Sequence, residues 1–465
     1  MERGVIGGGW RRGFLFLPIL LLGACDVDSI LEVEDPDVIL PGSVQGPTTL
    51  SAVHAHAIAE FSAGYIGDSA LSAGEGQVLM SGSLTDELIH TGTFDSREII
   101  DRRVATDVNP TALTPYQLLH RGRAAGDLAA RLFEEFAPNT ERHAEVQSLE
   151  GFAETIFGEN FCSGVPFSRQ TLEGALEYGA SQTTTQIFQA ALASFDAALA
   201  AAIAADSEEQ ENLARVGRAR ALLGLGRYAE AAAAAATVPT DFEYVMYHSE
   251  TTLRQNNSVW MYATSTGIFS VAEQEGGNGL PFRSRGNIAG SILDPRIPVE
   301  RIGLAQRGTL RPSEHWGQLK FPTRGSSTVL ANGIEARLIE AEAALREGAA
   351  GVSRFVSLHN GLRTSVGLAP LSQVTVAAMT QNDRVDLHFE ERAYWLYLTS
   401  HRLGDLRRMM WDYGRTQAQV FPSGTYFRTG APYGTDTNFP VPFDEGNNPE
   451  SMGCLTRDDA AGRDS

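Results

Sequence analysis

Apolar residues recur at helical spacing over several long stretches of the chain. In residues 115–137 they share one broad helix face, and residues 145–161, 183–206 and 352–367 have similar patterns. The face of residues 115–137 carries Leu118, Leu119, Ala125, Leu128, Leu132, Phe133 and Phe136. The pattern therefore predicts long helices in both halves of the chain.

Two glycines, Gly224 and Gly226, interrupt the helical pattern of residues 206–236. The sequence GLGRYA has the form of a dinucleotide-binding fingerprint, but that fingerprint follows a β-strand, and the residues before it have helical spacing. A tight turn between two antiparallel helices of tetratricopeptide type accounts better for the glycines, with Tyr228 and Ala231 packed between the helices. No nucleotide cofactor is predicted.

The pattern changes in residues 237–327, which are rich in Gly, Asn, Ser, Pro and aromatic residues and predict loops and short strands. Helical periodicity returns in residues 328–348, and residues 381–414 predict a buried helical pair. The predicted fold is mainly α: tetratricopeptide-like helical pairs over about 45–236 and 328–415, with irregular segments over about 237–327 and 416–465.

The N-terminal segment combines positive charge, a short apolar run and a cysteine. Three arginines precede the apolar run 14–22, and two small residues lead into Cys25. The run is shorter than the roughly 20 residues of a transmembrane helix, and the order of features is typical of an export signal. The ending resembles a lipobox, so Cys25 is predicted to carry the lipid. The alternative is an ordinary secretory signal with a coincidental cysteine.

This interpretation divides the chain into three parts. Residues 1–24 are a lipoprotein signal peptide, residues 25–44 a lipid-anchored tether, and residues 45–465 a single domain.

The charge of the chain limits its partners. It has 57 acidic residues against 37 Lys and Arg, a formal net charge of −20. This argues against nucleic acid, whose phosphates require Lys and Arg patches, and against electrostatic adhesion to anionic lipid. No segment after the signal is expected to be long and apolar enough to insert. Membrane attachment is therefore expected through the N-terminal lipid only.

Two cysteines remain after Cys25, namely Cys162 and Cys454. An exported protein meets oxidising conditions, so these two can form a disulfide. The bond would close a loop of about 290 residues and stabilise the fold by up to about 5 kcal/mol in the loop-entropy model. The alternative is two unpaired, buried thiols.

The sequence lacks a pattern typical of a metal site or an enzyme. His54 and His56 are two positions apart and point in nearly opposite directions on a helix, so they do not form a metal site with Glu60. Glu390 and Glu391 diverge by about 100° on a helix, so they do not flank a substrate as glycosidase carboxylates do. Ion pairs with nearby arginines account for them better.

Two segments carry residue types suited to sugar binding. Aromatic rings pack on the apolar C–H faces of sugars, and Asp, Asn and Arg bond their hydroxyls. Residues 84–103 and the central insertion 237–327 combine these types. The predicted ligand-binding residues are Asp86, Phe94, Arg97, Trp260, Tyr262, Arg283 and Trp316. The alternative for the two tryptophans is that they are core residues.

Four stretches occur in an order found in a known family of lipoproteins. They are CDVDSILEVEDP from Cys25, LDPRIPV in the central insertion, RVDLHFEERAYWLYLTSHRLGDLRR and NFPVPFDEGNNPE near the C-terminus. Together with the lipobox they resemble the SusD/RagB family of nutrient-binding outer-membrane lipoproteins. The third stretch is similar to that family's C-terminal helix pair through Arg384, Glu390, Glu391, Arg392, Arg402, Asp405, Leu406 and Arg407.

The resemblance implies a non-enzymatic helical protein without a cofactor, in which four helical pairs carry irregular segments that form the ligand face. It implies a lipoprotein of the outer membrane, at the cell surface, that binds an oligosaccharide or another nutrient. The ligand would pass to a SusC-like TonB-dependent transporter. Asp26, directly after the anchor, would favour inner-membrane retention under one bacterial sorting rule.

Two other classes of protein remain open. The first is a tetratricopeptide-type envelope scaffold lipoprotein that binds no small molecule; the long insertion between the helices disfavours it, because a pure scaffold would continue its repeat. The second is a helical glycan-degrading enzyme, which the lack of a separated carboxylate pair disfavours.

Overall fold

The structure is a computed structural model that describes Gly4 and residues 46–286, 293–304 and 314–464. The chain divides into two units, residues 1–39 and 40–465, and apart from Gly4 every described residue belongs to the second. Cys25, the tether and the signal peptide other than Gly4 lie outside the described residues. The predictions made for them therefore stay predictions.

Helices make up most of the described chain, so the predicted mainly α fold is confirmed. The longer helices are α2 (Leu50–Tyr65), α3 (Gln77–Leu84), α5 (Pro110–Phe136), α6 (Glu141–Asn160), α7 (Thr184–Ala204), α8 (Glu208–Gly224), α9 (Tyr228–Ala235), α12 (Gly333–Arg346), α13 (Val352–Ser365), α15 (Gln381–Trp395) and α16 (Arg402–Tyr413). The shorter ones are α4 (Asp95–Asp101), α10 (Ser258–Trp260), α11 (Phe282–Arg285), α14 (Gln373–Ala378) and α17 (Gln417–Val420), with single helical turns at Pro47–Thr49, Leu253–Gln255, Met261–Ser265, Glu275–Gly277, Gly348–Gly351, Phe443–Asn447 and Asp459–Ala461.

The strands of the described residues form two-stranded antiparallel pairs. The pairs are β1 (Leu88–His90) with β7 (Phe269–Val271), β2 (Val165–Pro166) with β5 (Ser181–Gln182), β3 (Arg169–Gln170) with β4 (Leu176–Glu177), β6 (Glu243–Met246) with β10 (Thr328–Asn332), and β8 (Val299–Leu304) with β9 (Glu314–Gln318). The β1–β7 pair, with Leu88 opposite Val271, joins the two segments predicted to bind ligand.

Glycines allow α6, α7 and α8 to pack closely. Phe195 of α7 lies against Gly217 of α8, and a Cβ atom at Gly217 would lie 2.1 Å from the phenylalanine ring. Phe188, two turns earlier, lies against both Gly158 of α6 and Gly224 of α8. A larger residue at any of these glycine positions would displace the phenylalanine rings, because protein interiors are packed without spare volume.

The turn predicted at Gly224 and Gly226 is confirmed. α8 ends at Gly224, and Gly226 has φ of +71°, a conformation that glycine adopts without steric cost. α9 begins at Tyr228, whose ring is buried together with Ala231. A helix precedes the glycines, so the sequence is not a dinucleotide fingerprint.

One predicted helix begins later than expected. Residues 328–348 were expected to be one helix, but residues 328–332 form β10, which pairs with β6, and α12 begins at Gly333. Asn332 caps α12 by accepting a hydrogen bond from the backbone N–H of Glu335 at 2.8 Å. The strand forms because β6, more than eighty residues earlier, supplies its hydrogen-bond partners.

The expectation that no segment after the signal is apolar enough to insert is wrong for α7. This helix has 21 residues and a mean hydropathy of 1.7 in its most apolar window, which meets the length and composition of a membrane span. Such evidence is weak for a single helix, and α7 packs between α6 and α8 with Phe188, Ala191 and Phe195 fully buried. Its buried face therefore belongs to the core of the helical scaffold, whereas Ile203 near its end is exposed.

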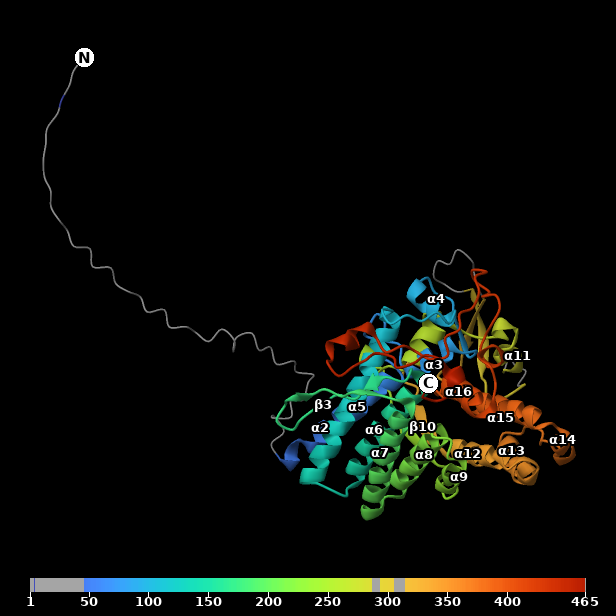
Figure 1. Cartoon of the computed structure of the whole chain (residues 1–465), viewed down its shortest axis with the longest axis horizontal. Coiled ribbons are helices and arrows are strands. Elements are labelled where there is room, and N and C mark those ends of the chain that lie inside the picture. The colour runs from blue at the N-terminus through green and yellow to red at the C-terminus, as the bar shows by residue number, and fades with distance from the viewer. Residues whose placement is uncertain (1–3, 5–45, 287–292, 305–313, 465) are drawn as a thin grey trace. The chain divides into compact units, whose positions relative to one another are not determined.

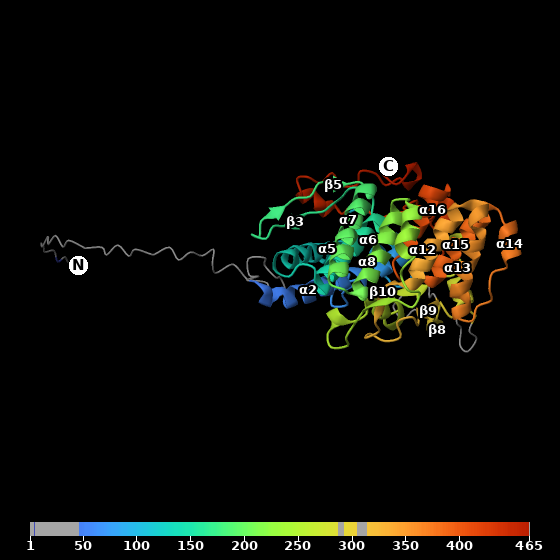
Figure 2. The same cartoon turned by 90° about the horizontal axis from the view of Figure 1, so that it is seen from below.

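The helices follow one another in a row. Figure 2 shows α2, α5, α6, α7, α8, α12 and α15 across the view, with the C-terminal segment on one side and β8 and β9 on the other. Successive helices of this row are in contact, including α2 with α5, α6 with α7, and α12 with α15. In Figure 1, α3, α4 and α11 lie on the other side of the view from α7, α8 and α9. The helical pairs thus form a scaffold along which the irregular segments lie.

The C-terminal segment is held to the scaffold by a disulfide. Cys162, just after α6, is bonded to Cys454, with their Cα atoms 5.8 Å apart. The backbone of Cys162 also donates to the carbonyl of Phe439 at 2.9 Å. The bond spans 292 residues of sequence, so it ties the tail to the first helical half.

Four buried charged side chains join α12, α15 and α16. Arg392 of α15 donates to both oxygens of Asp405 on α16 at 2.8 Å. Arg408 of α16 donates to Asp405 at 2.8 Å and to both oxygens of Glu342 on α12 at 2.8 and 2.9 Å. Burial alone would raise the pKa of Asp405, but Arg392 and Arg408 hold that pKa well below its usual range.

Replacing Asp405 by Asn is expected to lower the free energy of unfolding by about 3–5 kcal/mol, because Arg392 loses the carboxylate to which it donates two hydrogen bonds and Arg408 keeps only Glu342. Chemical denaturation followed by circular dichroism measures the change. The control is Asp241→Asn, at an exposed site, which should change the value by less than about 0.5 kcal/mol. Equal effects of the two substitutions would contradict a stabilising role for the buried network.

Candidate functional site

Three of the predicted ligand-binding residues lie together, with Phe94 exposed and Arg97 and Tyr262 buried. We call these three residues the Phe94 platform. Phe94 immediately precedes α4, and its side chain is 55% exposed. The guanidinium carbon of Arg97 lies 4.9 Å from the centre of the Phe94 ring and 5.7 Å from that of Tyr262. The platform therefore combines residues 84–103 with the central insertion. Figure 1 shows α4, which carries Arg97, at the edge of the molecule.

Buried contacts hold the platform in place. Arg97 forms an ion pair with the buried carboxylate of Glu75 and donates to the carbonyl of Ser72 at 2.9 Å. Burial raises the pKa of Glu75 from its usual 4.5, and Arg97 opposes the rise. The hydroxyl of Tyr262 donates to the carbonyl of Leu71 at 3.1 Å, and burial raises its pKa to about 12. The exposed ring of Phe94 thus lies against a guanidinium that is held by an ion pair with Glu75 and a hydrogen bond to Ser72.

Asp86 lies apart from the platform. It is fully buried, and both of its oxygens accept hydrogen bonds from Arg402 of α16, at 2.6 and 2.8 Å. Its Oδ2 also accepts from the backbone N–H of Leu280 at 2.8 Å. These contacts give Asp86 a structural role between the N-terminal segment, the central insertion and α16, and they place it beneath the surface.

Arg283 and Trp316 form a second, half-buried group. The guanidinium carbon of Arg283 lies 6.0 Å from the centre of the Trp316 ring, and the indole N–H donates to Glu314 at 3.2 Å. Arg283 also donates to the carbonyl of Val271, and burial lowers its pKa. Trp260 is half-buried and packs against the core, as does Trp316. Each tryptophan therefore packs partly in the core, as the alternative prediction for these two residues stated.

The adjacent glutamates Glu390 and Glu391 form separate ion pairs. Glu390 pairs with Arg285 at 2.5 Å, whereas Glu391 pairs with Arg296 at 2.8 Å and Arg363 at 2.5 Å. Ion pairing was predicted, but the partners come from the central insertion and α13 and not from α15 and α16. Within the described residues, no group of three His, Cys, Asp or Glu side chains is arranged to hold a metal ion.

The sequence patterns did not point to Glu75, the residue that forms an ion pair with Arg97. Glu75 stands between Gly74 and Gly76, where the chain passes very close to itself: a Cβ at Gly74 would lie 1.7 Å from the carbonyl oxygen of Asp68. A glutamate flanked by glycines just before a helix is a signal of a constrained carboxylate. Its partner could not be found in this way, because ion pairing depends on the fold.

The fold agrees with that of several solved proteins. A SusD superfamily protein from Parabacteroides distasonis has a TM-score of 0.62 at 14% identity, covering 88% of this chain and 98% of its own. A laminarin-binding SusD-like protein has a TM-score of 0.61 at 14% identity, covering 89% of this chain and all of its own. Surface glycan-binding protein A from Bacteroides uniformis has a TM-score of 0.61 at 14% identity, covering 87% and 99%.

The chain therefore has the SusD-like fold, and the predicted fold class is confirmed, as is the resemblance to SusD/RagB proteins at the level of structure. No protein-family model matches the sequence, and a comparison with curated proteins finds no significant match.

Glu87, next to Asp86, should make stability depend on pH. It is fully buried, and one of its oxygens accepts from the backbone N–H of Leu398 at 3.2 Å. Burial raises its pKa from 4.5 to about 8. Between these values the folded chain keeps a proton that the unfolded chain releases, so stability falls as the pH rises, by up to about 1.4 kcal/mol per pH unit.

Replacing Glu87 by Gln should remove this fall while keeping an uncharged polar group of similar shape. We expect the free energy of unfolding of the variant, relative to the parent chain, to increase steadily from pH 5 to pH 8 in urea denaturation. The control is Glu300→Gln on β8, an exposed site, which should follow the parent curve. A constant difference for the Glu87 variant would mean that the carboxyl is ionised throughout.

Proposed function

We propose that this protein is a cell-surface lipoprotein that binds an oligosaccharide and delivers it to a TonB-dependent outer-membrane transporter. The observation that carries the proposal is the Phe94 platform, an exposed aromatic ring on a fixed guanidinium, on a SusD-like fold. Two solved proteins of this fold are described as laminarin-binding and as surface glycan-binding. Binding without catalysis is in keeping with both.

The chemistry of the platform suits a sugar. The exposed face of Phe94 offers apolar surface to the C–H groups of a sugar ring. Thr93 and Asp95 flank it and are exposed, so their oxygens can bond the hydroxyls around that ring. Because Arg97 is fixed by Glu75, little side-chain motion has to be ordered when the ligand binds, which favours affinity.

The proposed anchor and partner rest on the sequence. The order of positive charge, short apolar run and Cys25 supports attachment of lipid, and two or more acyl chains provide stable anchoring. The stretches that resemble SusD/RagB proteins support a SusC-like partner. The second candidate is a scaffold lipoprotein, which the row of tetratricopeptide-like helical pairs would also suit.

Replacing Phe94 by Ala is expected to weaken oligosaccharide binding about tenfold, which corresponds to about 1.4 kcal/mol of lost ring contact. Isothermal titration calorimetry against a panel of soluble oligosaccharides, laminarin fragments included, measures the change. The matched control is Tyr247→Ala, which removes another strongly exposed ring from the segment after β6. Undiminished binding by the Phe94 variant would mean that the platform does not contact the ligand.

Affinity purification of the chain from its native membrane should recover a large TonB-dependent barrel in near-equal amount, as identified by mass spectrometry. The Cys25→Ser variant, which cannot carry the lipid, should instead appear in the soluble fraction. Recovery of only periplasmic or inner-membrane proteins would contradict the uptake role. Asp26 would then act as a retention signal, and the scaffold would be the better function.

A further inference from the structure

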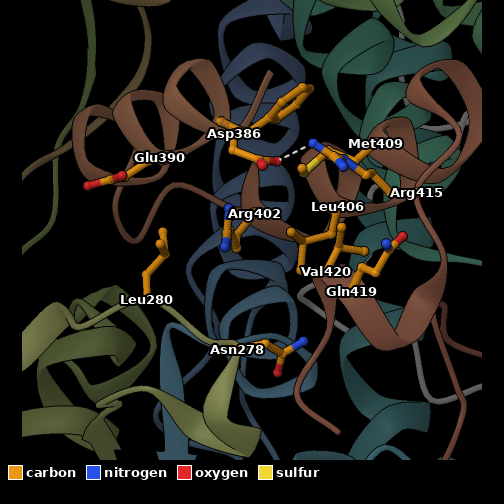
Figure 3. A pocket seen from close by; sticks show the side chains of 11 residues that line it. Asn278, Leu280, Asp386, Glu390, Arg402, Leu406, Met409, Arg415, Gln419 and Val420 are labelled. Atoms are coloured by element: carbon orange, nitrogen blue, oxygen red, sulfur yellow. Dashed lines mark hydrogen bonds and ion pairs between the residues drawn. The ribbon is translucent and has the colours of Figure 1, made fainter. Parts of the chain in front are cut away.

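A pocket of about 340 Å³ opens beside the C-terminal helix pair, and none of the Phe94 platform residues lines it. Figure 3 shows its walls, which come from the central insertion, α15, α16 and the segment that ends in α17. The volume lies in the range of small-ligand pockets, which is about 300–1,000 Å³. The lining residues are Asn278, Leu280, Asp386, Phe389, Glu390, Arg402, Leu406, Met409, Arg415, Gln419 and Val420.

Arg402 supplies a buried, oriented hydrogen-bond donor in this pocket. Its side chain is only 6% exposed, and Asp86 accepts from its Nε and Nη2 atoms. The third nitrogen, Nη1, takes no part in these hydrogen bonds to Asp86. Figure 3 places the guanidinium between Leu280 and Leu406. A ligand that supplies an acceptor to Nη1 would complete the hydrogen bonding of this group.

Every charge around the pocket has a partner of opposite sign. Arg415 pairs with Asp386 at 2.6 Å across one wall, and Glu390 pairs with Arg285 at 2.5 Å at the rim. Arg402 is neutralised by Asp86 in the same way. The pocket therefore presents donors and acceptors without a net charge, and a charged ligand would meet a group of like sign as well as one of opposite sign.

Apolar surface completes the walls. Leu280, Phe389 and Met409 line the pocket together with Leu406 and Val420. A suitable ligand thus has an apolar face and several neutral hydroxyl groups around it. These are the properties of a single sugar ring, whose C–H groups pack on apolar side chains and whose hydroxyls both donate and accept hydrogen bonds.

We propose that this pocket is a second carbohydrate site, which holds one neutral sugar residue with Arg402 and Glu390 bonding its hydroxyls. The inference rests on the proposed function, since it assumes a glycan ligand, and it adds a site that binds independently of the Phe94 platform. Asp86 acts here as a positioning residue, because it orients the guanidinium of Arg402 from below the surface.

The test uses neutral monosaccharides as probes, because one sugar ring is the unit that fits. Saturation-transfer NMR on the full chain, with glucose, galactose, mannose, xylose, arabinose, fucose and N-acetylglucosamine in turn, should detect binding of at least one. Leu280→Trp, which puts an indole into the pocket, should abolish the signal. Glu390→Ala, which breaks only a surface ion pair, should weaken binding at least fivefold without unfolding the chain.

The matched control is Glu250→Ala, which breaks a comparable surface pair with Arg324 and should leave the signal intact. Persistence of monosaccharide binding in both pocket variants would overturn the proposal. So would the absence of any monosaccharide signal. In the latter case calorimetry with soluble oligosaccharides separates the two failures: if oligosaccharides bind, only the pocket is wrong, and if none binds, the proposed glycan function fails as well.

Discussion

Three buried arginines on α16 bond this helix to other segments of the chain. Arg402 binds Asp86 of the N-terminal segment, Arg408 binds α12, and Arg407 reaches the carbonyls at the end of α6 and the carboxylate of Asp459 in the C-terminal tail. Each guanidinium is taken out of water, so each needs a carboxylate or carbonyl partner within the protein to offset the lost hydration. Removing one partner from such a pair costs about 3–5 kcal/mol, a large part of the 5–15 kcal/mol by which domains are typically stable. One helix is therefore bonded to the segment of Asp86, to the end of α6, to α12 and to the C-terminal tail.

This constraint also positions the segments that we propose to bind a ligand. Arg402 is held by Asp86, which in turn accepts from the backbone of Leu280 in the central insertion. The regular elements of the insertion are short, so these contacts and the β1–β7 and β6–β10 pairs hold it in place. Helices α6, α7 and α8 pack closely because rings of α7 lie against glycines of α6 and α8. Irregular segments on a rigid scaffold are a common arrangement for binding sites, since loops vary while the scaffold keeps its shape.

Local patterns predicted most of the fold. The helix ends near Gly224 and the turn after it follow from glycine and from apolar spacing, both of which act within a few residues. Prediction failed where distant contacts decided the outcome: residues 328–332 form a strand because β6 pairs with them. The same distinction applies to the residues predicted for the candidate site. Residue types pointed to Phe94, Arg97 and Tyr262, which lie together in the structure. They pointed equally to Asp86, whose partner Arg402 is 316 positions away in the sequence.

By itself, the sequence determined the helical pairs, the turn between α8 and α9, and the two irregular segments, because spacing and turn residues act locally. It also determined the net charge of −20, which argues against a function in nucleic-acid binding. Only the tertiary structure decided which polar residues are buried as ion pairs and which remain at the surface. The physical reason is that the cost of burying a charge depends on the partner that the fold brings to it, and that partner often comes from a remote part of the chain.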